Sequence, residues 1–219
     1  MSLFNESVFA GAGSGGDIIP IVKYDARSGR MSRSDYANGE RSSTDITRSF
    51  KAVFDFENIE TGTIDFSTGG APSFALARYG SPIPAAPSPS HKPGFRVLVY
   101  LSKECGGDLR EFASTAKACL KGINQLFTAY QQGVKQNPGK LPVVSLDDTV
   151  AIVTGEGAKK STAYSPVFTI QKWVDRPTGL VYTPRAVATA SAATSAPSAQ
   201  AAVSAPVEAS PFDDSDDFG

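Results

Sequence analysis

Basic and aromatic side chains lie close together at several points of the sequence, and together they could bind a single-stranded nucleic acid. Lysine and arginine bind phosphate groups, and aromatic rings stack on unpaired bases, each stack contributing about 1 to 3 kcal/mol. In residues 166–174 the period of a strand places Trp173 on the more polar face, away from Phe168 and near Lys172. The sequence therefore predicts a binding surface formed by Lys23, Tyr24, Arg27, Arg30, Arg96, Tyr100, Lys159, Lys160, Tyr164, Lys172, Trp173 and Arg176.

Nucleophiles, general bases and metal ligands are scarce. The single histidine, His91, lies in a Pro/Ser-rich loop, and Cys105 and Cys119 have no partner at a metal-binding spacing. Residues 155–161 lack the second glycine that a Walker phosphate loop needs before its lysine. We therefore predict no catalytic residue, no metal and no cofactor, in a protein that is not an enzyme.

A group of acidic residues leaves an enzymatic alternative open. Its members are Asp55, Glu57, Glu60 and Asp65. The first two would share one face of a strand, as the paired carboxylates of metal-dependent nucleases must. A solvated strand edge and turn explain these residues more simply, so a nuclease is the third hypothesis.

Length and charge indicate one soluble domain with an acidic tail. The chain has 219 residues, of which 41% are hydrophobic and 20% charged, which allows one domain with a sizeable core. No basic residue follows Arg185, whereas five of the 22 acidic residues do. Residues 1–185 therefore carry a formal charge of +4 and the remaining residues carry −5. A mildly basic body is joined to an acidic end.

The apolar periodicity predicts a mainly β fold with one long helix. Alternating or β-forming segments predict strands over 18–24, 31–36, 46–56, 61–66, 73–79, 95–101, 143–153 and 166–174. We assign Phe50, Phe54 and Phe56 to the core. Apolar residues at the helical period predict a helix from Asp108, as N-cap, to Gln136, before a stop at Asn137-Pro138-Gly139.

Composition divides the chain into four regions. Residues 1–16 end in a glycine-rich run and form a flexible arm, and residues 17–185 form the folded domain. Residues 186–211 are rich in Ala, Ser and Pro, and we interpret them as a disordered spacer. Residues 212–219 form an acidic tip, in which four aspartates lie between two phenylalanines: Phe212, Asp213, Asp214, Asp216, Asp217 and Phe218.

This organisation resembles that of single-stranded DNA-binding proteins, both bacterial and phage-encoded. Segments 21–27 and 166–174 also look like those of proteins from tailed-phage genomes, which favours the phage type. The resemblance implies an OB-fold β-barrel whose helix lies between its third and fourth strands. It also implies sequence-independent binding of single-stranded DNA in replication and recombination. The tip would recruit replication or recombination proteins and could compete with DNA for the binding groove.

The leading alternative is a phage structural or assembly protein whose acidic tail only solvates it. The N-terminus lacks the charged and apolar regions of a signal peptide, and no apolar stretch approaches the length of a membrane helix. We therefore expect a protein of the bacterial host cytoplasm that does not bind membranes. The sequence leaves its oligomeric state open.

Overall fold

The body of the chain is built mainly of β-strands. The structure, a computed structural model, describes residues 19–37, 40–67, 72–157 and 160–184. Its strands are β1 Ile21–Asp25, β2 Arg30–Ala37, β3 Glu40–Asp45, β4 Lys51–Phe54, β5 Glu60–Asp65, β6 Ser73–Arg78, β7 Lys92–Leu101, β8 Leu109–Ser114, β9 Lys140–Thr154 and β10 Ser161–Asp175. The helices are α1 Lys117–Gly133 and the 3-10 turns η2 Phe56–Asn58, η3 Lys103–Cys105 and η4 Val134–Gln136. Among these residues no helix has the length and apolar character to span a membrane.

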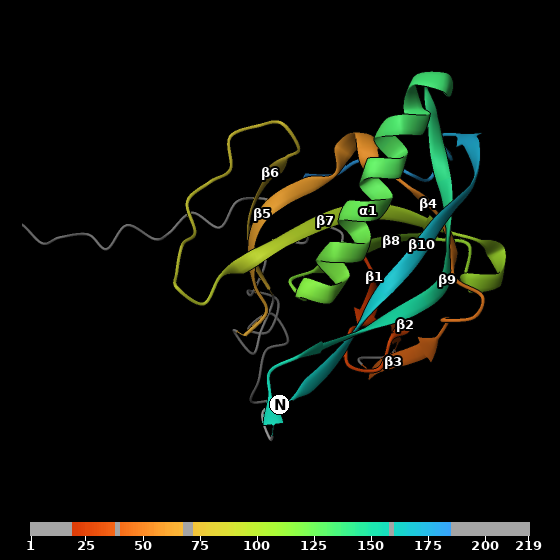
Figure 1. Cartoon of the computed structure of the whole chain (residues 1–219). Helices are drawn as coiled ribbons and strands as arrows, with labels where there is room; N and C mark the ends of the chain where they lie inside the picture. Colours follow the sequence, from red (N-terminus) through yellow and green to blue (C-terminus); the bar gives the residue numbers. More distant parts are fainter. Residues whose placement is uncertain (1–18, 38–39, 68–71, 158–159, 185–219) are drawn as a thin grey trace, which may run out of the picture. The chain divides into compact units, whose positions relative to one another are not determined.

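The strands form one sheet, in the order β10-β9-β4-β7-β8-β1-β2-β3, with β5 pairing with β6 and β7 (Figure 1). The predicted class, mainly β with one long helix, is confirmed. A closed barrel of the OB type stays a prediction, because no ladder among the described strands joins β10 to β3 or β1. The β1–β2 turn does meet β10, through a backbone hydrogen bond from Tyr164 N–H to the Ala26 carbonyl at 2.7 Å.

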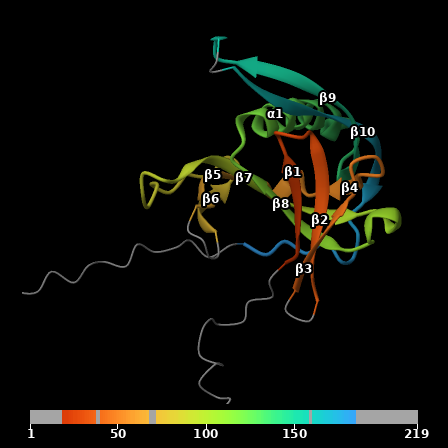
Figure 2. The ribbon, with the colours of Figure 1, turned by 90° about the horizontal axis from the view of Figure 1, so that it is seen from below.

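One face of this sheet supplies a large apolar core, which α1 covers. Phe112 of β8 is fully buried, and Ile123 of α1 packs into the same cluster. Figure 2 shows α1 alongside β10, with which it makes its main contacts. Phe50, Phe54 and Phe56 are each at most 2% exposed, so their assignment to the core is confirmed.

The prediction of a helix from Asp108 to Gln136 is wrong for its first part. Leu109–Ser114 forms strand β8, and α1 begins only at Lys117. Asp108 is not an N-cap, since its carboxylate accepts hydrogen bonds from Arg110 instead. The apolar residues of this segment fit a helical period, but it pairs with β7 on one side and β1 on the other. These pairings outweigh the local preference for a helix.

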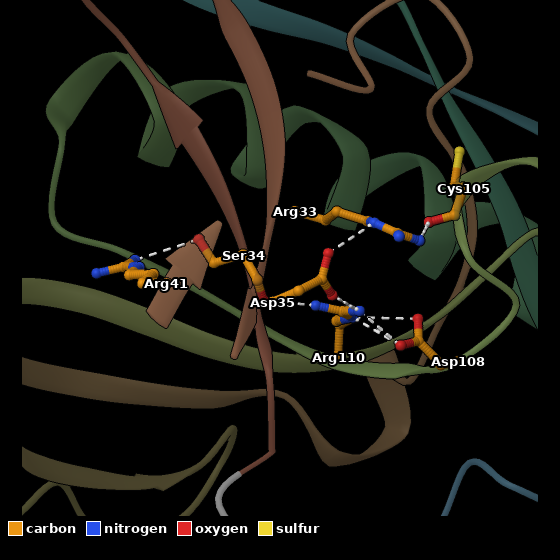
Figure 3. A network of polar contacts seen from close by, with 7 residues as sticks. All are labelled: Arg33, Ser34, Asp35, Arg41, Cys105, Asp108 and Arg110. Carbon is orange, nitrogen blue, oxygen red and sulfur yellow. Dashed lines mark hydrogen bonds and ion pairs between the residues drawn. The ribbon is translucent and has the colours of Figure 1, made fainter. Parts of the chain in front are cut away.

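A cluster of charged side chains joins β8 to β2 (Figure 3). The Arg110 guanidinium, 3% exposed, pairs with Asp108 at 2.6 Å and also with Asp35. Arg33 donates to the Cys105 carbonyl at 2.9 Å and lies 3.0 Å from Asp35. Because a buried charge without partners is strongly destabilising, these contacts allow Arg110 to lie next to the core.

Two further differences from the predicted strands have simple causes. The strand predicted over 46–56 is shorter, because residues 46–49 lie in a turn and residues 56–58 form η2. Strand β3 was not predicted, because all six of its residues are polar and exposed, so no apolar alternation marks it. The other seven predicted strands are found close to their predicted places.

The residues after β10 cover the face of β7 opposite the main core. Leu180 is 1% exposed and packs with Leu98 and Leu141 in a second apolar cluster. The predicted N-terminal arm (1–16), spacer (186–211) and acidic tip lie outside the described residues, and so do Phe212, Asp213, Asp214, Asp216, Asp217 and Phe218.

Candidate nucleic-acid interface

An open hollow of about 650 Å³ lies between two turns of the sheet. One turn joins β1 to β2, and the other leads from β3 toward β4. The hollow is lined by Ser28, Gly29, Arg30, Asp45, Thr47, Arg48 and Ser49. The two guanidinium groups are the part of this lining that suits a phosphate. The hydroxyls of Ser28, Thr47 and Ser49 and the Gly29 N–H all donate to groups within the turns.

Hydrogen bonds within the β1–β2 turn fix its conformation. The Asp25 carboxylate accepts from the Arg27 N–H at 2.9 Å and from the Ser28 hydroxyl at 3.0 Å, and Gly29 N–H donates to the Asp25 carbonyl at 2.8 Å. Gly29 has φ 69°, and a Cβ there would lie 3.3 Å from the Tyr164 side chain. Glycine therefore lets this turn rest against β10 in a left-handed conformation that other residues adopt only with strain.

Asp45 shapes the second turn and brings a negative charge to the hollow. Its carboxylate accepts from the Thr47 hydroxyl at 2.6 Å and the Thr47 N–H at 2.9 Å, and these bonds lower the pKa of the carboxyl, with a smaller effect from Arg30. The Arg30 and Asp45 side chains lie 3.2 Å apart and are 69% and 49% exposed. Exposed pairs contribute little net stability, so Arg30 can exchange this carboxylate for a phosphate oxygen.

Arg48 completes the cationic lining and was not among the predicted binding residues. It is exposed and forms no ion pair with another described residue. A signal for it did exist, since a basic residue at this position interrupts the strand period of 46–56. The hydroxyls of Ser28, Thr47 and Ser49 carry no comparable signal, because such residues are common in any turn.

The half-buried Tyr164 lies next to the hollow, because its Cβ is beside Gly29, although it is not one of the lining residues. Its N–H donates to the Ala26 carbonyl, and its own carbonyl accepts from the Tyr24 hydroxyl at 3.1 Å. These bonds hold β10 against the β1–β2 turn. The exposed Lys160 precedes it by four residues, whereas Lys159 lies outside the described residues. Of the predicted residues that the structure describes, Arg30 alone lines the hollow. Lys23 and Arg27 lie on β1 and its turn, Tyr164 lies beside Gly29, and Lys160 lies in the β9–β10 connection.

Tyr24 belongs to the core, so its prediction as a stacking surface is wrong. Its side chain is 4% exposed, and burial raises the pKa of its hydroxyl. The alternation of β1 turns Val22 and Tyr24 inward and leaves Lys23 and Asp25 exposed. The hydroxyl acts instead as the donor that holds Tyr164.

Trp173 lies on the face of β10 opposite to the predicted one. The register between β9 and β10 shifts between Ile170 and Lys172, which leaves Gln171 without a partner residue. Such a bulge reverses the alternation, so Trp173 joins Ile170 at the border of the main core. Its ring stacks on Tyr130 of α1, with centroids 5.7 Å apart. A tyrosine of the same chain therefore occupies the face predicted to stack on a base.

Lys172 and Arg176 lie at the other end of β10. Lys172 is exposed, whereas Arg176 pairs with Asp55 and Glu57 at 2.8 Å each. The hydrogen bonds from Arg176 to Asp55, and then to Glu57, raise the pKa of Arg176. Eight residues of strand separate Lys172 from Tyr164, which is roughly 26 Å at about 3.3 Å per residue. These two cations are therefore not part of the hollow.

Arg96 and Tyr100 lie beneath the segment that follows β10, so neither forms an open binding surface. Arg96 is 1% exposed, and its guanidinium pairs with Glu60 and, at 2.7 Å, with Glu111. It also donates to a carbonyl of the covering segment at 3.0 Å. Tyr100 is half-buried against the second apolar cluster. The prediction placed both on one face of β7 correctly but missed the segment that covers this face.

The acidic residues considered for a nuclease are Asp55, Glu57, Glu60 and Asp65. The first two share Arg176, the third binds the buried Arg96, and the fourth accepts from nearby serine hydroxyls. In the described part of the chain no three His, Cys, Asp or Glu side chains are grouped so that they could hold a metal ion. The geometry therefore lacks the pair of free carboxylates that this hypothesis requires.

Comparison with family models, with curated proteins and with solved structures found no significant match to this chain.

Proposed function

We propose that this chain binds single-stranded nucleic acid without sequence preference and that the hollow between the two turns holds the strand. The observation that supports this proposal is that exposed Arg30 and Arg48, from two different turns, line one open hollow beside Tyr164 of β10. Guanidinium groups bind phosphates of any sequence, and an aromatic ring stacks on any base.

The strand order supports the same proposal. In an OB barrel the first strand pairs with the second and the fourth, and the helix lies between the third and fourth. Here β4 pairs with β7 and β9, β8 follows β7, and α1 lies between β8 and β9. On this correspondence the β9–β10 connection is one of the loops with which OB proteins bind oligonucleotides. The hollow lies beside this hairpin, because Gly29 contacts Thr149 of β9 and Tyr164 of β10.

The acidic tip resembles that of single-stranded DNA-binding proteins, and this resemblance suggests a role for the whole chain. We place the binding activity in phage DNA replication and recombination, in the cytoplasm of the bacterial host. The tip, residues 212–219, would recruit replication or recombination proteins by offering carboxylates and phenylalanine rings to a basic, apolar pocket. A tail of charge −5 on a spacer would also be a local competitor for cationic groups on the body.

Fluorescence anisotropy of a labelled oligo-dT tests the proposed class. We expect tight binding that weakens with salt, with log K falling by about 0.7 per phosphate contact for each tenfold increase in salt. A duplex of equal length should compete poorly. Failure of both the full chain and a chain ending at Arg185 to bind would contradict the proposal and favour the structural or assembly protein, which predicts large particles without affinity for DNA.

Deleting residues 208–219 should tighten the binding of oligo-dT, because the deletion removes all five acidic residues that follow Arg185. The expected gain is largest at low salt and disappears as salt screens the tail. A matched control replaces the four aspartates of the tip by asparagine and keeps the length of the chain. Equal affinities for the full, shortened and neutralised chains would show that the tail does not compete with DNA.

A further inference from the structure

Strand β3 is an open edge of the sheet. It is the last strand in the pairing order, and its six residues pair with β2 in a continuous register without a bulge. Every residue of β3 is exposed, and no other described strand pairs with it. Proteins usually protect such an edge with charged side chains, proline, a bulge or a covering element. The opposite edge, β10, has a proline, two register shifts and contacts with α1, whereas β3 has neither a proline nor a register shift and carries only the charges of Glu40, Arg41 and Asp45.

The direction of the backbone groups shows which residues of β3 could pair outward. Ile46 N–H, directly after β3, donates to the Met31 carbonyl of β2 at 2.9 Å. Backbone groups alternate sides along a strand, so the even-numbered residues of β3 face β2. The N–H and C=O groups of Arg41, Ser43 and Asp45 therefore point away from the sheet.

We infer that this edge is a self-association site, on which β3 of a second copy pairs antiparallel about Ser43. A two-fold axis at Ser43 places each Arg41 opposite Asp45 of the other copy, and Ser43 opposite itself. All three outward-pointing residues are then used, and six backbone hydrogen bonds form. Registers shifted by two residues leave one of the three without a partner. This inference does not depend on the proposed nucleic-acid binding.

The charges of β3 match this register. Arg41 and Asp45 lie on the same face of the strand as Ser43, because their positions differ by even numbers. Across the two-fold axis they form two identical pairs of opposite charge, and opposite charges that face each other stabilise a strand pair. Within one copy, Arg41 donates to the Ser34 hydroxyl at 3.2 Å (Figure 3). Because this acceptor is neutral, Arg41 can exchange it for the Asp45 carboxylate of the second copy. The pairing also brings Arg41 of the second copy to Asp45 at the rim of the hollow.

Disulfide trapping in the full chain tests the register directly. In the inferred dimer the two Ser43 Cα atoms form a hydrogen-bonded pair about 5.5 Å apart, within the range that a disulfide spans. The S43C variant should form a covalent dimer at least tenfold faster than S42C or T44C, whose equivalent residues would be separated by roughly 8 Å. The native cysteines are buried and do not interfere. Equal rates for the three variants would overturn the inference.

Sedimentation of the full chain over a range of concentrations tests the dimer without a cross-link. We expect a concentration-dependent dimer whose dissociation constant rises at least tenfold in R41E but not in the exposed control K140E. S43P should be monomeric and folded, because the lost N–H points away from β2, whereas S43T should still dimerise. A wild-type chain that sediments as a monomer at every concentration would overturn the inference, and so would occupation of the edge by another segment of the same chain.

Discussion

Replacing Arg30 and Arg48 together by alanine should weaken the binding of oligo-dT by about 30-fold, since each lost phosphate contact is worth about 1 kcal/mol. Both side chains are exposed and line the hollow, so the variant should keep its fold. The slope of log K against log salt should also become shallower by about 1.4, which corresponds to two phosphate contacts on a single strand. Anisotropy titrations at three or more salt concentrations measure both quantities.

A control variant with the same change of charge distinguishes binding of DNA in the hollow from attraction of DNA by the net charge of the body. Lys135 and Lys140 are exposed and lie near the end of the β9–β10 hairpin that is far from Tyr164. Replacing both by alanine removes two positive charges and should leave the salt slope almost unchanged. If both double variants lose affinity and slope equally, the body attracts DNA through its net charge, and the hollow is not the binding site.

Replacing Arg96 by methionine should destabilise the body by about 3 to 5 kcal/mol, the usual effect of breaking a buried ion pair from one side. The guanidinium pairs with Glu60 and Glu111 and also holds the segment after β10 through a carbonyl. Both carboxylates would lose their counter-charge in an environment where they are at most 5% exposed. Urea unfolding, followed through the fluorescence of Trp173, measures the loss.

A triple variant separates the charge effect from the loss of packing. Replacing Arg96, Glu60 and Glu111 all by methionine removes both signs of charge together, and such replacements of buried ionic groups are often neutral or stabilising. The triple variant should therefore be more stable than R96M alone. A triple variant no more stable than R96M would show that the unpaired carboxylates cost nothing, and that R96M loses stability through other contacts of Arg96, such as that with the Thr183 carbonyl.

The class of fold could be predicted from the sequence because most strands bury only one face, and such strands show an alternating apolar pattern. Phe50, Phe54 and Phe56 alternate with polar residues, and all three are buried. The two strands that the sequence did not reveal have no such pattern. β3 is polar throughout, and β8 is defined by its two neighbouring strands, since its apolar residues also fit a helix.

The candidate site was predictable in part, and the errors have physical causes. Arg27 and Arg30 are exposed at the β1–β2 turn, as cations in a turn should be, and Tyr164 lies in β10 and meets that turn. Their role in binding stays a prediction. Trp173 was placed on the wrong face because a bulge at Gln171 leaves no trace in the apolar pattern. From the sequence alone, Arg96 is expected to be a surface cation. It is buried because β7 pairs with β5 and β8, which bring Glu60 and Glu111 next to it from distant parts of the sequence.

The measurement that tests the central claim most directly is ultraviolet cross-linking of the full chain to oligo-dT carrying 5-iodouracil, with the adducts mapped by mass spectrometry. The account predicts adducts at Tyr164 or within the turns at residues 26–30 and 45–49, and their loss in the Arg30 and Arg48 double variant. Adducts concentrated at Tyr79, Phe66 or Trp173, with none at these turns, would contradict it.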